Sequence, residues 1–479
     1  MLPVSAQGGR PESRRCTIEG KVPLTPIQRY CLNALGEGFR KNILVTVYEC
    51  REKLSPALLD RALKHLIVHH DALRLGLRAE NSGWQQWSAG VDLLDTVSLT
   101  EFIEPATQEL PIEEEAAINQ IAERLSSSID LGAPPLLRAA IIDFGPDRKQ
   151  QLVLAIHHLG IDPLSFSILI EDLCVAYEHA KSGAPISLPE KTTSYKKWAE
   201  HLISFSQSSE LHDEEEYWLS LPWSKCVPLP RDFPDTKLGI NIIGETNRER
   251  FVSFDPSDTG ALLQLQREHR MLLDEILLAA LARAVHDWTH HPVTAIKLMH
   301  HGRADSFAGI DVSRTVGWFS TEIPIVLEIP PLADFEQTLQ LVKNHMQKLP
   351  RHGIGYGVLR YLKGNETLAS LPAPEIRLNH LGHLWKAEGS ELLQGRSNGF
   401  RGGIALDCLI ELRTYIYENR FYAQWIYDER IYRENTLDVL IESFTNSLSQ
   451  AIQSRQPAKQ QLLSRKGTVS SVPSSAQIT

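Results

Sequence analysis

The 479-residue sequence has few cysteines and no cysteine pattern that could hold a metal. Its six cysteines are widely spaced, and no two of them form a C-x-x-C pair. This spacing argues against a cysteine-built zinc site and against a disulfide-stabilised secreted domain. The N-terminus also has no apolar signal-peptide core. Together these absences predict a reduced, cytoplasmic protein without a bound metal.

Long apolar runs and an excess of positive charge are missing as well. The best apolar run, residues 276–282, is far too short to cross a bilayer. The 49 lysines and arginines are outnumbered by 59 aspartates and glutamates, which gives a net charge of −10. This balance argues against nucleic acid or a membrane as the main partner. Neither G-x-x-x-x-G-K-[ST] nor a strand-linked G-x-G-x-x-G occurs, so we do not expect the chain to activate a substrate with ATP.

What is present is the composition of an ordinary globular protein, with 42% hydrophobic and 23% charged residues. Strand and helix patterns alternate along the chain, which predicts an α+β fold of two or more domains. We predict a mobile leader at residues 1–20, an N-terminal lobe at 21–185, a C-terminal lobe at 186–455 and a disordered tail at 456–479. The lobe boundary is placed where Gly183-Ala184-Pro185 begins a proline-marked crossing.

The strongest chemical signal lies in residues 151–172. An apolar run predicts a buried strand that ends in His157 and His158, and a helix is predicted to follow a short turn that contains Asp162. Neighbouring strand side chains point to opposite faces, so one imidazole can face a cavity while the other is buried. The chain has 18 histidines and four adjacent pairs, but only this pair combines strand end, turn, carboxylate and helix. We therefore predict acid–base chemistry here.

Six short motifs carry a resemblance that covers about residues 21–455. They are Leu24-Thr25-Pro26-Ile27-Gln28, His70-Asp71-Ala72-Leu73-Arg74, His157-His158 with Asp162, Ser313-Arg314-Thr315-Val316-Gly317-Trp318-Phe319, Gly355-Tyr356-Gly357-Val358-Leu359-Arg360-Tyr361 and Asn379-His380-Leu381-Gly382. In this order they resemble the condensation-domain superfamily of nonribosomal peptide synthetases, relatives of chloramphenicol acetyltransferase. The resemblance implies two chloramphenicol acetyltransferase-like lobes that form a V with a tunnel between them.

The resemblance also implies roles for single residues. His158 is the expected catalytic residue, which faces the tunnel as a general base or as a positioning group. His157, Asp162 and Arg303 are expected to support the site, with the aspartate paired to the arginine. Pro163 stands where the family usually has glycine, which forbids a positive φ there.

Five further residues are candidates for contact with the tunnel or with a reaction intermediate. Ser165 could donate to an oxyanion, although serines at helix starts usually cap the helix. Trp318 and Tyr356 are expected to pack in the core or the tunnel wall. The remaining candidates are His301 and Asn379.

The chemistry that the resemblance implies is the joining of two substrates. Family members transfer an acyl or aminoacyl thioester, carried on the phosphopantetheine arm of a peptidyl or acyl carrier protein, to a small-molecule amine or alcohol acceptor. The product is an amide or an ester, and no bound cofactor is expected. Only short tails flank the catalytic part, so we expect a freestanding condensation enzyme, monomeric like its relatives. Coenzyme A presents the same pantetheine arm and stays an alternative donor.

One departure separates this sequence from the epimerization branch, which several of its motifs resemble most. That branch uses the glutamate of a Glu-Gly-His-Gly-Arg segment as a second acid–base group, whereas the corresponding residues here are Met299-His300-His301-Gly302-Arg303. A thioether cannot carry a proton, so inversion at an α-carbon loses one base unless a neighbouring histidine replaces it. The departure favours bond formation. An epimerization-type domain and a non-catalytic domain that only recruits carrier proteins remain alternatives.

Overall fold

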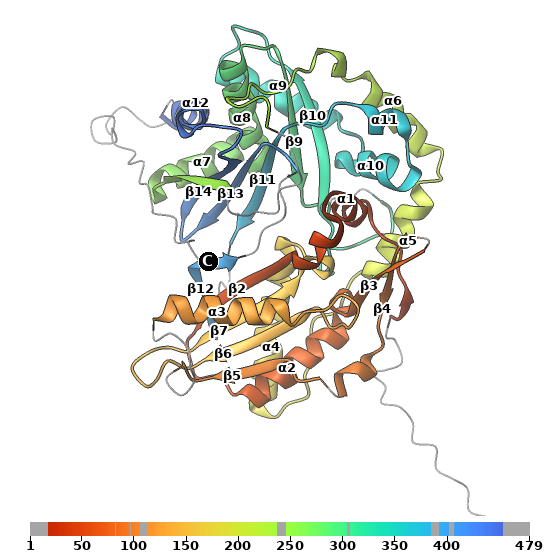
Figure 1. Ribbon diagram of the computed structural model, residues 1–479, viewed down its shortest axis with the longest axis vertical. Coiled ribbons are helices and arrows are strands. Elements are labelled where there is room, and N and C mark those ends of the chain that lie inside the picture. Colours follow the sequence, from red (N-terminus) through yellow and green to blue (C-terminus); the bar gives the residue numbers. More distant parts are fainter. Residues whose placement is uncertain are drawn as a thin grey trace, which may run out of the picture.

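The computed structural model describes residues 18–81, 83–95, 97–105, 113–236, 246–303, 307–384, 392–401 and 407–453. Of the predicted leader only residues 18–20 fall in these ranges, and the predicted tail lies outside them. Helices and strands form two halves, one above the other in Figure 1, which confirms the α+β class. No helix within these ranges is long and apolar enough to cross a membrane.

The lower half in Figure 1 is built on a five-stranded sheet with the order β12-β2-β7-β6-β5. Its elements are β2 (Ile43–Cys50), β5 (Thr100–Ile103), β6 (Leu137–Ile142), β7 (Gln151–His157), β12 (Leu393–Arg401), α2 (Pro56–His69), α3 (Glu114–Ser127) and α4 (Pro163–Ser182). Helix α3 covers one face, while α2 and α4 pack against each other over the opposite face. Side chains along β7 alternate between these two cores: Val153 joins the α3 side and Leu154 the α2–α4 side.

The upper half is built on a six-stranded sheet with the order β10-β9-β11-β13-β14-β8. Its elements are β8 (Asn247–Phe254), β9 (Val293–His300), β10 (Thr321–Glu328), β11 (Ile376–His383), β13 (Ile410–Tyr417), β14 (Arg420–Asp428), α7 (Pro256–His269), α8 (Leu273–Thr289), α9 (Phe335–Lys348) and α12 (Glu434–Gln453). Helix α8 contacts β9 and β11 and also packs against α9 and α12. The alternate residues Ile296, Leu298 and Leu378 belong to this apolar core.

A helix and a strand cross from one half to the other. Helix α1 (Pro26–Leu35) precedes the lower sheet in the chain, but it contacts β10 and the π-helical turn Val358–Lys363 of the upper half. Strand β12 comes late in the chain, yet it pairs antiparallel with β2 in the lower sheet. Apart from β12, the strands of the lower sheet come before residue 185 in the chain and those of the upper sheet come after it. We keep the lobe boundary near residue 185 as a proposal.

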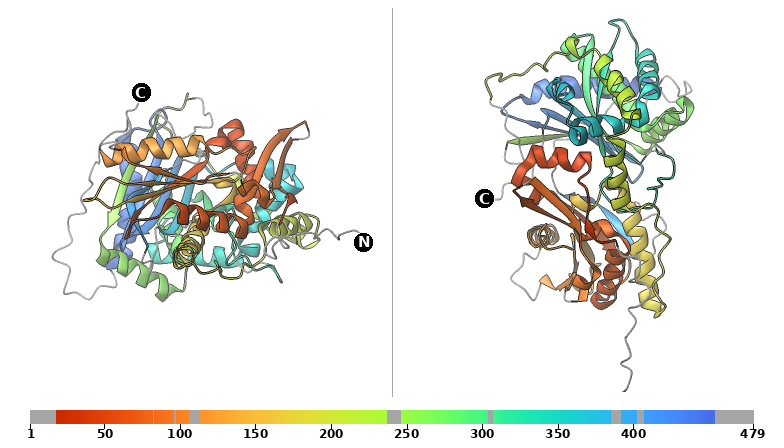
Figure 2. Two further views of the ribbon diagram at one scale, coloured as in Figure 1. Left: turned by 90° about the horizontal axis from the view of Figure 1, so that it is seen from below. Right: turned by 90° about the vertical axis from the view of Figure 1, so that its right-hand side faces the viewer.

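The remaining elements lie around these sheets, as the two views of Figure 2 show. They are a small sheet of β1 (Gly20–Lys21), β3 (Leu75–Glu80) and β4 (Gly83–Ser88), together with α5 (Tyr195–Phe205), α6 (Glu210–Ser220), α10 (Ile354–Gly357) and α11 (Glu366–Ser370). Helices α5 and α6 follow the crossing after α4 and run along the side of the molecule (Figure 2).

Local sequence signals explain how α1 reaches the site. The helix begins at Pro26, as the Thr25-Pro26 pair predicts, and the Gln28 side chain accepts the N–H of Thr25 at 3.0 Å. The same Gln28 side chain donates to the carbonyl of Leu159 at 3.2 Å. Because Leu159 directly follows the histidine pair, this buried bond fixes α1 against the turn that carries the site.

Candidate active site

A cavity of about 600 Å³ lies between the two halves of the molecule. Its wall is formed by α1, by the turn between β7 and α4, by residues near 313–320, and by parts of α7, α8, β9, β11 and β13. Apolar side chains make up much of this wall, and its polar groups include several histidines and arginines and two aspartates. The structure brings the predicted residues His158, Asp162 and Arg303 together at this wall.

His157 is the buried member of the histidine pair. Its Nδ1 accepts the N–H of Leu159 at 3.0 Å, and its Nε2 lies 3.0 Å from the carbonyl oxygen of Phe39. Because Nδ1 accepts, Nε2 carries the proton and donates to that carbonyl. Burial lowers the pKa of His157 to about 3, so the ring is neutral at pH 7. Both ring nitrogens therefore hold the turn in place.

His158 lines the cavity, with only 3% of its surface exposed. Its ring centroid lies 4.2 Å from that of Trp318. Its Nδ1 is buried and makes no hydrogen bond within the described residues, which leaves Nε2 as the nitrogen for the cavity. Burial lowers the pKa of His158 to about 4, although the Asp162 carboxylate and nearby backbone groups oppose this shift. A neutral imidazole is thus available at the wall to accept a proton.

Asp162 holds together three segments around His158. Its Oδ1 accepts the N–H of Ser165 at 2.7 Å and so caps α4, while Oδ2 accepts the N–H of Phe319 at 3.1 Å. Nη2 of Arg303 donates to both oxygens, at 3.1 and 3.3 Å. Both side chains of this ion pair are nearly fully buried. A carboxylate with four such donor contacts is a scaffold, and we do not assign proton transfer to it.

Ser165 belongs to the same scaffold. Its hydroxyl donates to the carbonyl of Gly317 at 2.8 Å and accepts from the N–H of Gly317 at 3.0 Å and from Nη2 of Arg303 at 2.7 Å. No hydroxyl hydrogen remains for an oxyanion, and Ser165 does not line the cavity. The expected contact of Ser165 with an intermediate stays a prediction, and it would require the hydroxyl to leave its bond to the distant segment that contains Trp318.

Of the remaining candidates, Trp318 and Asn379 line the cavity and Tyr356 does not. Trp318 lines the cavity beside His158, and Asn379 on β11 lines it from the upper half. Tyr356 is not among the residues that line this cavity. Its ring packs against Trp218 and its hydroxyl accepts from Nη1 of Arg360 at 2.7 Å. Tyr356 is thus part of the upper core.

Met299 and His300 end β9, His301 follows directly, and all three line the cavity. The chain turns sharply after them at Gly302, whose φ is +66° and where a Cβ atom would lie 1.8 Å from the carbonyl oxygen of Phe319. This turn directs backbone N–H groups back to the two imidazoles: Gly302 donates to Nδ1 of His300 at 3.3 Å and Arg303 donates to Nδ1 of His301 at 3.0 Å.

A polar sheet face on the upper side of the cavity was not predicted from the sequence. Strand register places two rows of side chains across β9, β11 and β13, which are Lys297, Arg377 and Glu411 in one row and Met299, Asn379 and Arg413 in the other. The members of each strand are two residues apart and so share one face. Charged residues within three otherwise apolar strands, namely Lys297, Arg377, Glu411 and Arg413, were the signal that could have revealed this face.

The residue of α1 that meets this face is Tyr30. Its hydroxyl bonds to the carboxylate of Asp407 and accepts from Lys297 at 3.2 Å and from Arg377 at 3.0 Å. Burial and the nearby Glu322 carboxylate raise the pKa of Tyr30 well above its usual value, so the phenol stays protonated. This buried network joins α1 to the upper sheet.

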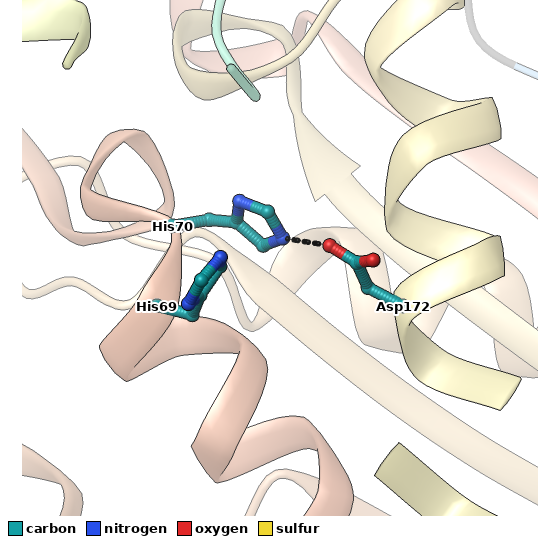
Figure 3. A group of neighbouring side chains, drawn as sticks. All are labelled: His69, His70 and Asp172. Atoms are coloured by element: carbon teal, nitrogen blue, oxygen red, sulfur yellow. Dashed lines mark hydrogen bonds and ion pairs between the residues drawn. The ribbon is translucent and has the colours of Figure 1, made fainter. Parts of the chain in front are cut away.

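Within the described residues, one group of three side chains has the composition of a metal site. His69 and His70 at the end of α2 lie beside Asp172 of α4, with ligand atoms within 4.8 Å of one another (Figure 3). However, Asp172 already accepts from Nε2 of His70 at 2.9 Å and from Arg314 at 2.7 Å. Lys191 donates to the backbone of His69 at 3.3 Å, which adds a second nearby cation. We therefore interpret this group as a link between α2, α4 and the segment that contains Arg314, and the absence of a metal stays a prediction.

The buried histidines predict a loss of stability in acid. Burial lowers the pKa values of His157 and His300 to about 3 and that of His158 to about 4, below the 6.5 of an unfolded chain. The unfolded state therefore binds more protons as the pH falls from 6.5 towards 4, and each histidine removes about 1 kcal/mol of stability per pH unit. We expect urea midpoints to be flat above pH 7 and to fall steeply below pH 6. Replacement of the exposed His212 by glutamine serves as control and should leave this slope unchanged; a midpoint that is constant down to pH 4.5 would contradict the buried assignments.

Comparisons with known proteins agree with the motif order. The family described as "Condensation domain" matches residues 18–468. A linear gramicidin synthase of Brevibacillus parabrevis is 32% identical over 466 residues, which cover 94% of this chain but 9% of that protein. Tyrocidine synthase 1 of the same organism is 32% identical over 454 residues, which cover 90% of this chain and 40% of that protein. The chain thus spans less than half the length of either relative.

Solved structures extend this similarity to the fold. The epimerization domain from the third module of tyrocidine synthetase B superposes with a TM-score of 0.80 at 28% identity, over 93% of this chain and 99% of that one. The first condensation domain of the CDA synthetase gives a TM-score of 0.71 at 16% identity, over 91% and 96% of the two chains, and supports the fold alone. Family match, sequence identity and fold lead to one conclusion: this chain belongs to the condensation-domain family, with a chloramphenicol acetyltransferase-like fold.

Proposed function

We propose that this chain transfers an acyl or aminoacyl group from a pantetheine-bound thioester to an amine or hydroxyl acceptor, which forms an amide or an ester. One observation carries the proposal. A neutral, nearly buried His158 lines the cavity between the halves, while a thioether, Met299, occupies the position of the epimerization branch's glutamate. A neutral imidazole at this position suits a reaction that removes a single proton.

The reaction needs no covalent intermediate with the protein. The acceptor nitrogen or oxygen forms a bond to the acyl carbon, and the carbonyl electron pair moves onto its oxygen. The proton that leaves the acceptor passes to Nε2 of His158. Collapse of the tetrahedral intermediate breaks the carbon–sulfur bond, and the same proton neutralises the departing pantetheine thiolate. His158 thus receives and returns one proton in each turnover.

Other residues of the chain hold the His158 imidazole in position. Asp162, Arg303 and Ser165 fix the turn that carries His158, and Trp318 packs against its ring. Held in this way, the imidazole loses little entropy when two substrates meet beside it, and such alignment can lower a barrier by several kcal/mol. The thioester fits a carrier protein that brings it on a phosphopantetheine arm, and the cavity would hold the arm's reactive end.

A product assay tests the proposal. Acyl thioesters of pantetheine, coenzyme A and a peptidyl carrier protein are each incubated with a set of amines and alcohols, and the products are identified by mass spectrometry. We expect an amide or ester whose rate rises with enzyme concentration. Release of free acid alone from every donor would contradict the proposed transfer.

Epimerization is the second candidate, and Asp274 is the observation that favours it. This residue, in the first turn of α8, lines the same cavity, and burial raises the pKa of its carboxyl to about 6. Such a group can both hold and release a proton near neutral pH. An epimerase that uses it would invert L-aminoacyl-pantetheine, and Asp274→Asn would abolish the inversion. Our account expects no D-isomer on chiral chromatography, and transfer by Asp274→Asn close to the wild-type rate.

A further inference from the structure

The two histidines at the end of β9 have a fixed protonation pattern. Each Nδ1 accepts a backbone N–H, that of Gly302 for His300 and that of Arg303 for His301. A neutral imidazole has one N–H and one lone pair, so a ring whose Nδ1 lone pair is engaged carries its hydrogen on Nε2. Burial lowers the pKa of both rings, and that of His300 to about 3, so both are neutral at pH 7. Each ring is thus a hydrogen-bond donor through Nε2.

The sequence left open whether a histidine takes the role of the epimerization branch's glutamate, and this protonation pattern rules that out. A base needs a free lone pair, and neither His300 nor His301 has one while its backbone bond persists. Neither ring can therefore replace the missing glutamate as a proton acceptor. What the rings can offer a ligand is an N–H group.

His300 is the better placed of the two donors. Only 5% of its surface is exposed, and it lines the cavity from the upper half, whereas His158 lines it from the lower half. Its Nε2 makes no hydrogen bond to any described residue and is not fully enclosed. His301 lines the same cavity but is exposed, so water competes for its N–H.

We propose that Nε2–H of His300 donates a hydrogen bond to the carbonyl oxygen of the pantetheine-linked acyl group, the oxygen that becomes negative in the tetrahedral intermediate. This assignment rests on the proposed acyl transfer and adds a second catalytic group to it. The two halves then have different roles. His158 of the lower half accepts the proton through its lone pair, and His300 of the upper half stabilises the oxyanion through its N–H. A fixed donor of this kind can accelerate a reaction about 100-fold.

A carbonyl probe tests the bond without turnover. The carba analogue of an acyl-pantetheine, in which CH₂ replaces the thioester sulfur and ¹³C marks the ketone carbon, places a stable carbonyl where the thioester carbonyl would lie. Bound to the wild-type protein, its C=O stretch should shift to lower wavenumber. The shift should be lost in His300→Phe, which keeps a ring without a donor. It should persist in His300→Gln, whose amide N–H₂ can take the position of Nε2–H.

Kinetics supply the second readout. We expect His300→Phe to lower kcat for acyl transfer about 100-fold with little change in KM, His300→Gln to restore most of the rate, and the matched control His301→Phe to have a smaller effect. A stretch that is the same in wild type and His300→Phe, a loss confined to KM, or failure of the probe to bind would each overturn the assignment. If the stretch depends on His300 but no product forms, the proposed transfer is wrong and the donor stands. If product forms without that dependence, the donor alone is wrong.

Discussion

Replacement of His158 by alanine is expected to lower acyl transfer by about 10²–10⁴-fold, the usual contribution of a positioned general base. The substitution removes the imidazole that lines the cavity, but the backbone N–H of residue 158 still donates to the carbonyl of Asn42 at 2.9 Å. No hydrogen bond to another described side chain is lost, because Nδ1 has none. Single-turnover assays should therefore show the loss while urea unfolding shows a stable protein.

His157 provides the matched control on the neighbouring residue. His157→Ala leaves the buried N–H of Leu159 without a partner, which costs about 1–3 kcal/mol of stability. It also removes the donor Nε2 from the carbonyl of Phe39, which keeps only the N–H of Asn42 at 3.0 Å. We thus expect opposite results from the two adjacent histidines. His158→Ala should lose the acyl-transfer rate, whereas His157→Ala should lose free energy of unfolding. Full transfer activity in His158→Ala would contradict our account. Normal binding of carrier protein without any transfer by the wild type would favour a recruiting role instead.

The second large effect is expected at the Asp162–Arg303 ion pair. In Arg303→Met the Asp162 carboxylate stays buried without its cation, and we expect a loss of about 3–5 kcal/mol in the free energy of unfolding. The damage extends further, because Nη1 of Arg303 also donates to the carbonyls of Val312 and Thr315, at 2.8 and 2.7 Å. Urea unfolding measures the loss.

A double-mutant cycle separates the pair from these other bonds. Asp162→Asn combined with Arg303→Met should cost less than the sum of the single changes, with a coupling of about 0.5–3 kcal/mol. The exposed pair of Arg124 and Glu101, 2.7 Å apart, is the control, and its disruption should cost less than about 1 kcal/mol. Strict additivity at Asp162 and Arg303 would show that the buried pair does not hold the turn.

Short-range patterns predicted the parts of the fold that depend on neighbouring residues. Thr25-Pro26 marks the start of α1. The apolar runs at 136–144 and 151–156, with a turn that contains Gly145-Pro146 between them, predict the antiparallel hairpin that β6 and β7 form. The runs at 409–417 and 421–427, rich in apolar and aromatic residues, likewise predict a hairpin around Glu418-Asn419. Strands β13 and β14 form it, and both turn residues have the positive φ of a tight turn. In each case the signal and its consequence lie within a few residues of one another.

Contacts between distant segments were harder to predict. Ser165 has the position of an ordinary helix-start serine, and only the approach of Gly317 and Arg303 occupies its hydroxyl. The charges of Arg377 and Glu411 become neighbours through strand register, which the order of the chain does not reveal. The roles of His300 and His301 depend on backbone N–H directions after Gly302, which follow from a turn that no side-chain pattern encodes.

One measurement tests the single-base account most directly. An aminoacyl-pantetheine thioester and an amine acceptor are incubated with the wild-type protein in deuterium oxide, beside a reaction without enzyme, and both thioester and product are examined by mass spectrometry. We predict an amide whose α-carbon carries no deuterium above the enzyme-free level, and a remaining thioester that is equally unlabelled. Deuterium that enters the α-carbon in a His158-dependent manner, without amide formation, would contradict the account.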